Sequence, residues 1–160
     1  MKTLLLIRHA EAGWGDFGAP DVERCLTSRG EKEALAMGAT LLTAGVLPDV
    51  FISSTAKRAR MSTKLILQGM QTSEHGVIWR DDLYLASAKK LFSVAQACDD
   101  KVQTLALLAH NPGLSELAND CLPEPIYGMS PCSVVSITWN TMHWQDISMA
   151  DGQLQAYFSP

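Results

Sequence analysis

The 160-residue sequence has no long apolar run, and its four cysteines contain no C-x-x-C pair. No segment approaches the roughly 20 apolar residues of a membrane-spanning helix, so we expect no membrane span. The apolar run near the start stops after four residues at Arg8, whereas a signal-peptide core needs roughly 7–15. Scattered cysteines predict reduced thiols, a cytoplasmic protein and no metal site. They are Cys25, Cys98, Cys121 and Cys132.

Excess positive charge, repeats and low-complexity segments are also missing. The formal net charge is −4, which disfavours general binding to nucleic acid. With 47% hydrophobic residues, the chain is long enough for one sizeable core, and a second domain is not expected. We therefore predict a single domain over residues 1–160. The sequence does not indicate an oligomeric state.

The stretch from Leu4 to Ile7 is the clearest structural signal. It is too short for a buried helix and is typical of a strand covered on both faces. Arg8 and His9 follow where this strand ends, and ligands bind at the carboxyl ends of strands in open parallel sheets. A cation beside an imidazole suggests a phosphoryl group, held by one side chain and attacked by the other. Taken alone, the pair fits a solvated strand end and a turn residue equally well.

Strand and helix patterns alternate along the rest of the chain. Thr27 or Ser28 can cap the first helix, with Glu31 at capping-box distance from Ser28. The alternation predicts an α/β fold with three layers, in which a mainly parallel sheet has helices on both faces. We expect further strands at 50–52, 77–79, 104–109, 133–139, 143–149 and 154–158, the last forming an antiparallel hairpin at one edge. We expect helices at 28–44, 57–67, 87–97 and 114–121.

The second predicted helix begins with an unusual number of cations. A helix N-terminus prefers negative charge, so this arrangement costs stability unless an anion lies nearby. For Lys57, Arg60 and Lys64, a solvated basic face is the simpler interpretation. Arg58 differs because it follows the polar end of a strand, Ser53-Ser54-Thr55.

Three predicted strand ends carry the same kind of chemistry. Arg8 and His9 follow the first strand, Arg58 follows the second, and His110 ends the strand at 104–109. Guanidinium groups grip phosphate oxygens in a bidentate way. One histidine can act as a nucleophile, and the other can donate a hydrogen bond to the transferring group. The sequence therefore predicts a phosphate pocket at this edge of the sheet.

Four segments resemble the histidine phosphatase (phosphoglycerate mutase-like) superfamily. Residues 6–11 resemble its Arg-His-Gly motif, 53–60 its Ser-Ser-Pro-x-x-Arg-Ala motif, and 109–113 its third motif. Residues 26–30 match a Leu-Thr-x-x-Gly pattern. Ala10 and Thr55 depart from the usual glycine and proline, without removing a catalytic side chain. The short chain and the His-Asn-Pro-Gly form at residues 110–113 resemble the SixA-type phosphohistidine phosphatase branch.

The resemblance implies a phosphoglycerate mutase-like fold without a cap insertion and assigns roles to the site residues. His9 would be the nucleophile that becomes a phosphohistidine, while Arg8, Arg58 and His110 would form the phosphate pocket. Arg24 would be a further phosphate or substrate contact, with a surface loop charge as the alternative. No metal or other cofactor is implied. Since His9 must be neutral to attack, activity should fall between pH 8 and pH 5.

A general acid is missing from its expected place. Many members carry a glutamate or aspartate after the third strand, but no acidic residue follows Leu83 here. Asp82, Glu11 and Asp16 are weak substitutes. Without an acid an alkoxide leaves with difficulty, whereas an imidazole, whose conjugate acid has a pKa of about 6.5, leaves easily.

The sequence therefore predicts a metal-independent phosphatase that acts on phosphohistidine on a protein. A small-molecule phosphomonoesterase of the same fold is the nearest alternative. An inactive module that binds phosphate or a phosphoprotein is a third interpretation. Each implies a phosphorylated protein or small phosphorylated substrate as partner. We expect substrate choice to lie in the loops at residues 13–24 and 122–130.

Overall fold

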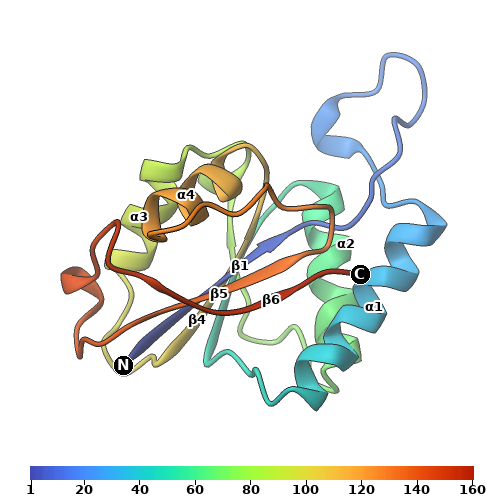
Figure 1. The fold of residues 1–160 in the computed structure, drawn as a ribbon. Helices are drawn as coiled ribbons and strands as arrows, with labels where there is room; N and C mark the ends of the chain where they lie inside the picture. The colour runs from blue at the N-terminus through green and yellow to red at the C-terminus, as the bar shows by residue number, and fades with distance from the viewer.

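The computed structural model describes all 160 residues, with strands and helices alternating along most of the chain (Figure 1). No helix combines the length and apolar composition needed to cross a membrane. The strands are β1 (Lys2–Arg8), β2 (Val50–Ser54), β3 (Ile78–Arg80), β4 (Thr104–Ala109), β5 (Val134–Trp139) and β6 (Gln153–Phe158). The helices are α1 (Ser28–Thr43), α2 (Lys57–Gly69), α3 (Ala88–Gln96) and α4 (Gly113–Cys121). Three short 3-10 helices are η1 (Asp21–Glu23), η2 (Asp81–Leu83) and η3 (Trp144–Asp146).

The six strands form one sheet in the order β3-β2-β4-β1-β5-β6. β3, β2, β4 and β1 are parallel, while β5 runs antiparallel to β1, and β6 antiparallel to β5. Helices α1 and α2 cover one face of the sheet, and α3 and α4 cover the other (Figure 1). The predicted three-layer α/β fold, with an antiparallel hairpin at one edge, is confirmed.

Strand β1 runs through the middle of the core. Leu4 and Leu6 pack into the cluster that contains α3 and α4, whereas Leu5 and Ile7 pack into the cluster that contains α1 and α2. All four side chains are fully buried. Because successive side chains of a strand point to opposite faces, a strand covered on both sides needs an unbroken apolar run. This requirement explains the sequence that leads to Arg8.

Two glycines fix the position of α2 against α1. A Cβ atom at Gly38 would lie 2.0 Å from the carbonyl oxygen of Ile66, and one at Gly69 would lie 2.1 Å from that of Leu35. Only glycine allows the two backbones to approach this closely. The close packing holds α2, whose first turn carries Arg58, at a fixed height beside the sheet.

Thr27, one of the two N-caps predicted for α1, is confirmed, whereas the capping box at Ser28 and the strand at 143–149 are wrong. The N-cap of α1 is Thr27, whose side chain accepts a hydrogen bond from the Gly30 amide at 3.0 Å, so no capping box starts at Ser28. The segment 143–149 contains η3 rather than a strand. Trp144 is fully buried there, and its indole nitrogen donates to the Val102 carbonyl at 2.8 Å. The buried Trp144 side chain therefore holds this segment in place, and the segment does not pair with a strand.

Candidate active site

A cavity of about 340 Å³ lies at the carboxyl ends of β1, β2 and β4. All five residues singled out from the sequence line it, namely Arg8, His9, Arg24, Arg58 and His110. The remaining wall comes from Glu11, Ala12, Asp21, Leu85, Asn111 and Pro131. The parallel strands thus bring together side chains that are up to 102 positions apart, from Arg8 to His110.

Hydrogen bonds fix the orientation of the His9 ring. Its Nδ1 atom lies 2.8 Å from the Ala10 carbonyl oxygen. A carbonyl oxygen only accepts, so Nδ1 carries the ring proton and Nε2 carries the free lone pair. The Nε–H group of Arg58 donates to that Nε2 atom at 3.3 Å. The ring is therefore held in the tautomer that a nucleophile requires.

The surroundings of His9 also keep it neutral. Burial, with the nearby charges of Arg58, Arg8 and Arg24, lowers the pKa of His9 to about 4, against the opposing hydrogen bond to Ala10. At neutral pH the Nε2 lone pair is therefore available.

The second histidine is arranged differently. The His110 ring centroid lies 5.1 Å from that of His9, and its Nε2 atom is 2.8 Å from the Ser54 hydroxyl oxygen. That oxygen accepts a hydrogen bond from the Ala56 amide, so its own proton is free to be donated to His110 Nε2. In this arrangement the ring proton is on Nδ1, which is buried without a partner. Burial, with the nearby charges of His9 and Arg58, lowers the pKa of His110 to about 3.

Arg8 and Arg24 differ in how their nitrogens are paired, and Arg8 has a donor without an acceptor. Arg8 donates from Nη1 to the Met129 carbonyl at 2.8 Å, while its Nε atom is buried without an acceptor. Arg24 donates from Nε to the Gly13 carbonyl at 2.8 Å, and its guanidinium stacks on the Trp14 ring, 4.3 Å from the centroid. Its side chain is 17% exposed and lines the cavity, so it is not a solvated charge on the outer surface of the loop. Buried unpaired donors are rare, and an anionic ligand would satisfy them.

Asp21 and Tyr84 belong to the cavity region, and the sequence interpretation missed both. The Asp21 carboxylate accepts hydrogen bonds from Arg58 Nη2 at 3.0 Å, from Arg24 Nη1 at 3.2 Å and from the Tyr84 hydroxyl. The Asp21 carbonyl also accepts from Arg58 Nη1 at 2.8 Å. A usable signal was present, since Asp21 lies three residues before Arg24 and Tyr84 directly follows Leu83, where an acid was sought.

The charge state of Asp21 follows from these contacts. The hydrogen bond from Tyr84, together with those from Arg24 and Arg58, lowers the pKa of Asp21 to about 2. The same contact raises the pKa of Tyr84. Asp21 is therefore ionised at neutral pH and has no proton to give to a leaving group.

The three acids considered from the sequence have different positions. Glu11 lines the cavity, and its carboxylate accepts from the Thr27 hydroxyl at 3.0 Å. Asp82 is outside the cavity, where it pairs with Arg80 at 2.6 Å and with Lys90 at 2.8 Å. Asp16 is exposed and does not line the cavity. Of the three, Glu11 alone is placed to reach a ligand.

The motif residues have identifiable structural tasks. A Cβ atom at Gly30 would lie 2.2 Å from the Glu11 carbonyl oxygen, so the first turn of α1 can lie against the chain after His9 only with glycine there. Ala10 is fully buried, and its amide donates to the Ser62 hydroxyl at 2.9 Å. Thr55, in place of proline, donates to the Asp81 carboxylate. Both departures from the family pattern fit the fold without disturbing the cavity.

The other basic residues of α2 lie outside the cavity. Lys57, Arg60 and Lys64 are exposed, and Lys64 pairs with Glu74 at 3.7 Å. Arg60 stacks on the Trp79 ring, 4.9 Å from the centroid. The interpretation of these three residues as a solvated basic face is confirmed, as is the different position of Arg58.

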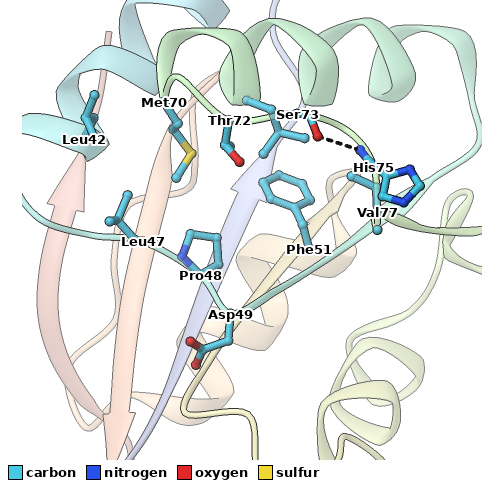
Figure 2. Close-up of a pocket in the computed structure, with 12 residues that line it drawn as sticks. Leu42, Leu47, Pro48, Asp49, Phe51, Met70, Thr72, Ser73, His75 and Val77 are labelled. Atoms are coloured by element: carbon cyan, nitrogen blue, oxygen red, sulfur yellow. Dashed lines mark hydrogen bonds between the residues drawn. The ribbon is translucent and has the colours of Figure 1, made fainter.

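Figure 2 shows a second pocket, of about 330 Å³, near the amino ends of β2 and β3. It lies at the opposite end of the parallel strands from His9. Half of its 12 lining residues are hydrophobic, Phe51 and Met70 among them, and it contains no arginine. Its histidine, His75, is exposed, and the Asp49 carboxylate accepts from the amides of Gln103 and Thr104. No converging polar groups mark this pocket as a phosphate site.

Comparison with known proteins agrees with the fold and the motifs. Residues 4–83 match the family model of the histidine phosphatase superfamily (branch 1), and the chain belongs to this superfamily. An uncharacterised chloroplast protein of Arabidopsis thaliana is 25% identical over 130 residues, which cover 74% of this chain. The chain spans 58% of the length of that relative.

Solved structures share the fold over almost the whole chain. SixA from Agrobacterium tumefaciens superposes with a TM-score of 0.82 at 22% identity, covering 99% of each chain. The protein histidine phosphatase SixA complexed with tungstate superposes with a TM-score of 0.83 at 19% identity, covering 98% of this chain and 96% of that one. The fold is therefore the phosphoglycerate mutase-like fold of the SixA proteins.

Proposed function

We propose that residues 1–160 form one histidine phosphatase domain without a cap insertion, which removes the phosphoryl group from phosphohistidine on a protein. His9 is the nucleophile, and no metal takes part. The observation that carries the proposal is the unprotonated Nε2 atom of His9, whose lone pair faces Arg58 Nε beside His110 in a cavity that also contains Arg8, with its buried unpaired Nε atom. Membership of the superfamily supports it.

The reaction has two transfers. In the first, the Nε2 lone pair of His9 forms a bond to phosphorus. The bond from phosphorus to the substrate imidazole breaks, leaving its electron pair on the departing nitrogen; the other nitrogen of the substrate ring carries a proton, so a neutral imidazole leaves. In the second, a water oxygen bonds to phosphorus and loses its proton to solvent, while the bond between phosphorus and His9 breaks. Inorganic phosphate is released and His9 is restored. Arg8 and Arg58 neutralise the phosphoryl oxygens, and His110 donates from Nδ1.

A nitrogen-linked phosphate is proposed as the substrate because of the side chains that could, or could not, protonate a leaving group in the cavity. Asp21 is ionised, Asp82 lies outside, and Glu11, which lines the cavity, has a carboxylate that accepts a hydrogen bond from the Thr27 hydroxyl. An imidazole leaving group needs little help from an acid, whereas an alkoxide needs much. A phosphohistidine therefore suits these residues better than a phosphate ester.

A protein substrate is supported by the rim of the cavity. Trp14, Phe17, Leu85 and Tyr127 are large apolar side chains that are more than half exposed. Leu85 lines the cavity, and the others lie on the two loops that lead into its wall. Exposed apolar groups gathered beside a polar site are typical of protein-binding surfaces. The likeness to a protein histidine phosphatase complexed with tungstate, an oxyanion, is consistent with this substrate class.

A small-molecule phosphomonoesterase is the second candidate, favoured by the position of Glu11. Its carboxylate lines the cavity and, if protonated, could supply an ester leaving group with a proton. An inactive binding module is less well supported, because a phosphate-binding role alone would not require the oriented lone pair of His9.

A trapping assay distinguishes these functions. The protein is mixed briefly with a radiolabelled phosphohistidine-bearing phosphotransfer domain or with labelled sugar phosphates, and the label on this chain is then measured. We expect transfer from the phosphotransfer domain, with label that survives neutral pH and is lost in acid. His9→Ala should accumulate none, whereas the matched control His75→Ala should label normally, because His75 is exposed and remote.

Two outcomes would contradict the proposal. Efficient hydrolysis of sugar phosphates with an untouched phosphotransfer domain would favour the phosphomonoesterase. Acid-labile label on His9→Ala would show that another residue is the nucleophile. Activity should also persist after treatment with a chelator, and loss of activity that added metal restores would refute a metal-independent reaction.

A further inference from the structure

Asp21 lies where the two phosphate-binding arginines meet. Its carboxylate accepts from Arg58 Nη2 at 3.0 Å and from Arg24 Nη1 at 3.2 Å. Arg58 is 3% exposed, whereas the Asp21 side chain is 45% exposed. A buried guanidinium thus meets an anion that belongs to the chain itself. The mechanism proposed above gives this carboxylate no role.

Every nitrogen of the Arg58 guanidinium already has a partner. Nε donates to His9 Nε2, while Nη1 and Nη2 donate to the carbonyl and the carboxylate of Asp21. These bonds use three of the five N–H groups of the guanidinium. A phosphoryl group arriving at His9 Nε2 displaces the contact that Nε–H makes there and competes with the Asp21 carboxylate for the same guanidinium charge. Asp21 therefore loses part of its interaction with Arg58.

The segment that carries Asp21 is able to make this exchange. Asp21 begins η1, a three-residue 3-10 helix with no buried residue. The chain between β1 and α1 projects away from the body of the molecule (Figure 1). Val22, which is only partly buried, is the one apolar residue of η1 that packs against the core, so few apolar contacts oppose a shift of this segment. Tyr84 is the one further side chain that holds the Asp21 carboxylate, through its hydroxyl.

We propose that the Asp21 carboxylate is an internal ligand of Arg24 and Arg58 that a phosphoryl group displaces, and that it thereby weakens binding of free phosphate. The inference rests on the phosphate site of the proposed function. A carboxylate that competes for the same arginines raises the dissociation constant of every oxyanion. A phosphoprotein offsets the lost affinity with contacts outside the cavity, whereas inorganic phosphate makes no such contacts. Asp21 thus weakens binding of the free product more than binding of the substrate, and it speeds product release.

The test compares oxyanion affinities by calorimetry at pH 7.5, with inorganic phosphate and tungstate as probes. Asp21→Asn keeps the shape of the side chain and removes its charge. We expect it to bind both anions about tenfold more tightly than the unsubstituted protein, which corresponds to about 1.4 kcal/mol. Asp16→Asn is the matched control, because it removes the same charge from the same loop outside the cavity. It should change affinity less than twofold, since solvent screens its charge.

Tyr84→Phe gives an independent reading, since it retains the charge of Asp21 and removes one hydrogen bond to it. We expect an affinity gain of about two- to threefold, between those of the control and Asp21→Asn. The Asp21 carboxyl carbon should also change its NMR shift when phosphate is added to the unsubstituted protein. Affinity that is unchanged or weaker in Asp21→Asn would overturn this inference alone. Absence of oxyanion binding to any variant would overturn the phosphate site as well.

Discussion

The Nε–H group of Arg58 points at the Nε2 lone pair of His9 across 3.3 Å. The two residues are 49 positions apart and come from different layers of the fold, one from α2 and the other from the end of β1. The contact places a fixed positive charge beside the atom that would receive a phosphoryl group. The same charge helps to keep His9 unprotonated.

Arg58→Ala should lower kcat/KM for the phosphoprotein about 100- to 1,000-fold, because loss of one donor to the transferring group has this effect in comparable sites. Arg58→Lys should restore little, since a lysine cannot contact His9 and a phosphoryl oxygen with one planar edge. Arg60→Ala is the matched control on the same helix and should retain full activity, because Arg60 is exposed. If Arg58→Ala and Arg60→Ala lowered kcat/KM equally, the positive charge of α2 would be responsible for the effect, and the contact between Arg58 and His9 would not.

Ser54→Ala should lower kcat about fivefold with little change in KM. The Ser54 hydroxyl holds the ring proton of His110 on Nδ1, and a net hydrogen bond is worth about 1 kcal/mol. Nitrogen NMR of His110 should show a mixture of tautomers in this variant and one tautomer in the unsubstituted protein. Ser54→Thr keeps the hydroxyl and should retain the single tautomer. A tautomer mixture in the unsubstituted protein would contradict the assignment.

The pH dependence of activity is expected to differ from that of an ordinary histidine. An unperturbed pKa places the acid fall between pH 8 and pH 5, whereas burial lowers the pKa of His9 to about 4. The free protein should therefore keep kcat/KM nearly constant from pH 8 to pH 5 and lose it below pH 4. An acid-stable aryl phosphate is the appropriate substrate, since phosphohistidine decays in acid and a phenolate needs less help from an acid than an alkoxide does. A fall centred near pH 6.5 would mean that His9 is not buried as described.

Stability should fall as the pH drops from 6.5 towards 4. His110 is neutral in the folded protein over this range, with a pKa of about 3, whereas the unfolded chain takes up a proton near pH 6.5. The unfolded state therefore binds more protons, and acid favours it. Between pH 6.5 and pH 5, His110 should account for about 2 kcal/mol of lost unfolding free energy. In the His110→Asn variant, the unfolding free energy measured by urea denaturation should change by about 2 kcal/mol less between pH 6.5 and pH 5 than in the unsubstituted protein. An equal change in the two proteins would contradict the lowered pKa of His110.

Much of the cavity could be predicted from the sequence, because parallel strands end at one edge of a sheet. Arg8, His9 and His110 each follow an apolar strand, so the topology alone brings them together. Arg58 follows β2 by one short connection and is carried in by the start of α2. These positions depend on the hydrophobic pattern, which a sequence displays directly.

Contacts that depend on loop conformation could not be predicted in this way. Asp21 reaches Arg58 and Tyr84 only because η1 turns the chain back over the cavity, and no periodicity marks that turn. The segment around Trp144 has a strand-like sequence, yet burial of one large side chain gives it a different backbone. Side-chain anchoring overrides local propensity in such places, and the pattern does not show it.

The exposed aromatic rim should affect protein substrates alone. Phe17 and Tyr127 are fully exposed on the two loops that lead into the cavity wall. Substituting both with serine should raise KM for a phosphohistidine-bearing protein about tenfold, because each buries apolar surface only when a partner docks. Activity towards a free phosphoramidate should stay within twofold.

Met142→Ser is the control for that substitution. Met142 is also exposed, but it follows the end of β5 that pairs with the amino end of β1, away from the cavity. Its loss should leave KM for the protein substrate unchanged. If the rim substitutions impaired the phosphoramidate as strongly as the protein, the loops would be shaping the cavity itself. If they impaired neither substrate, the partner would have to dock elsewhere, and the rim would no longer support a protein substrate.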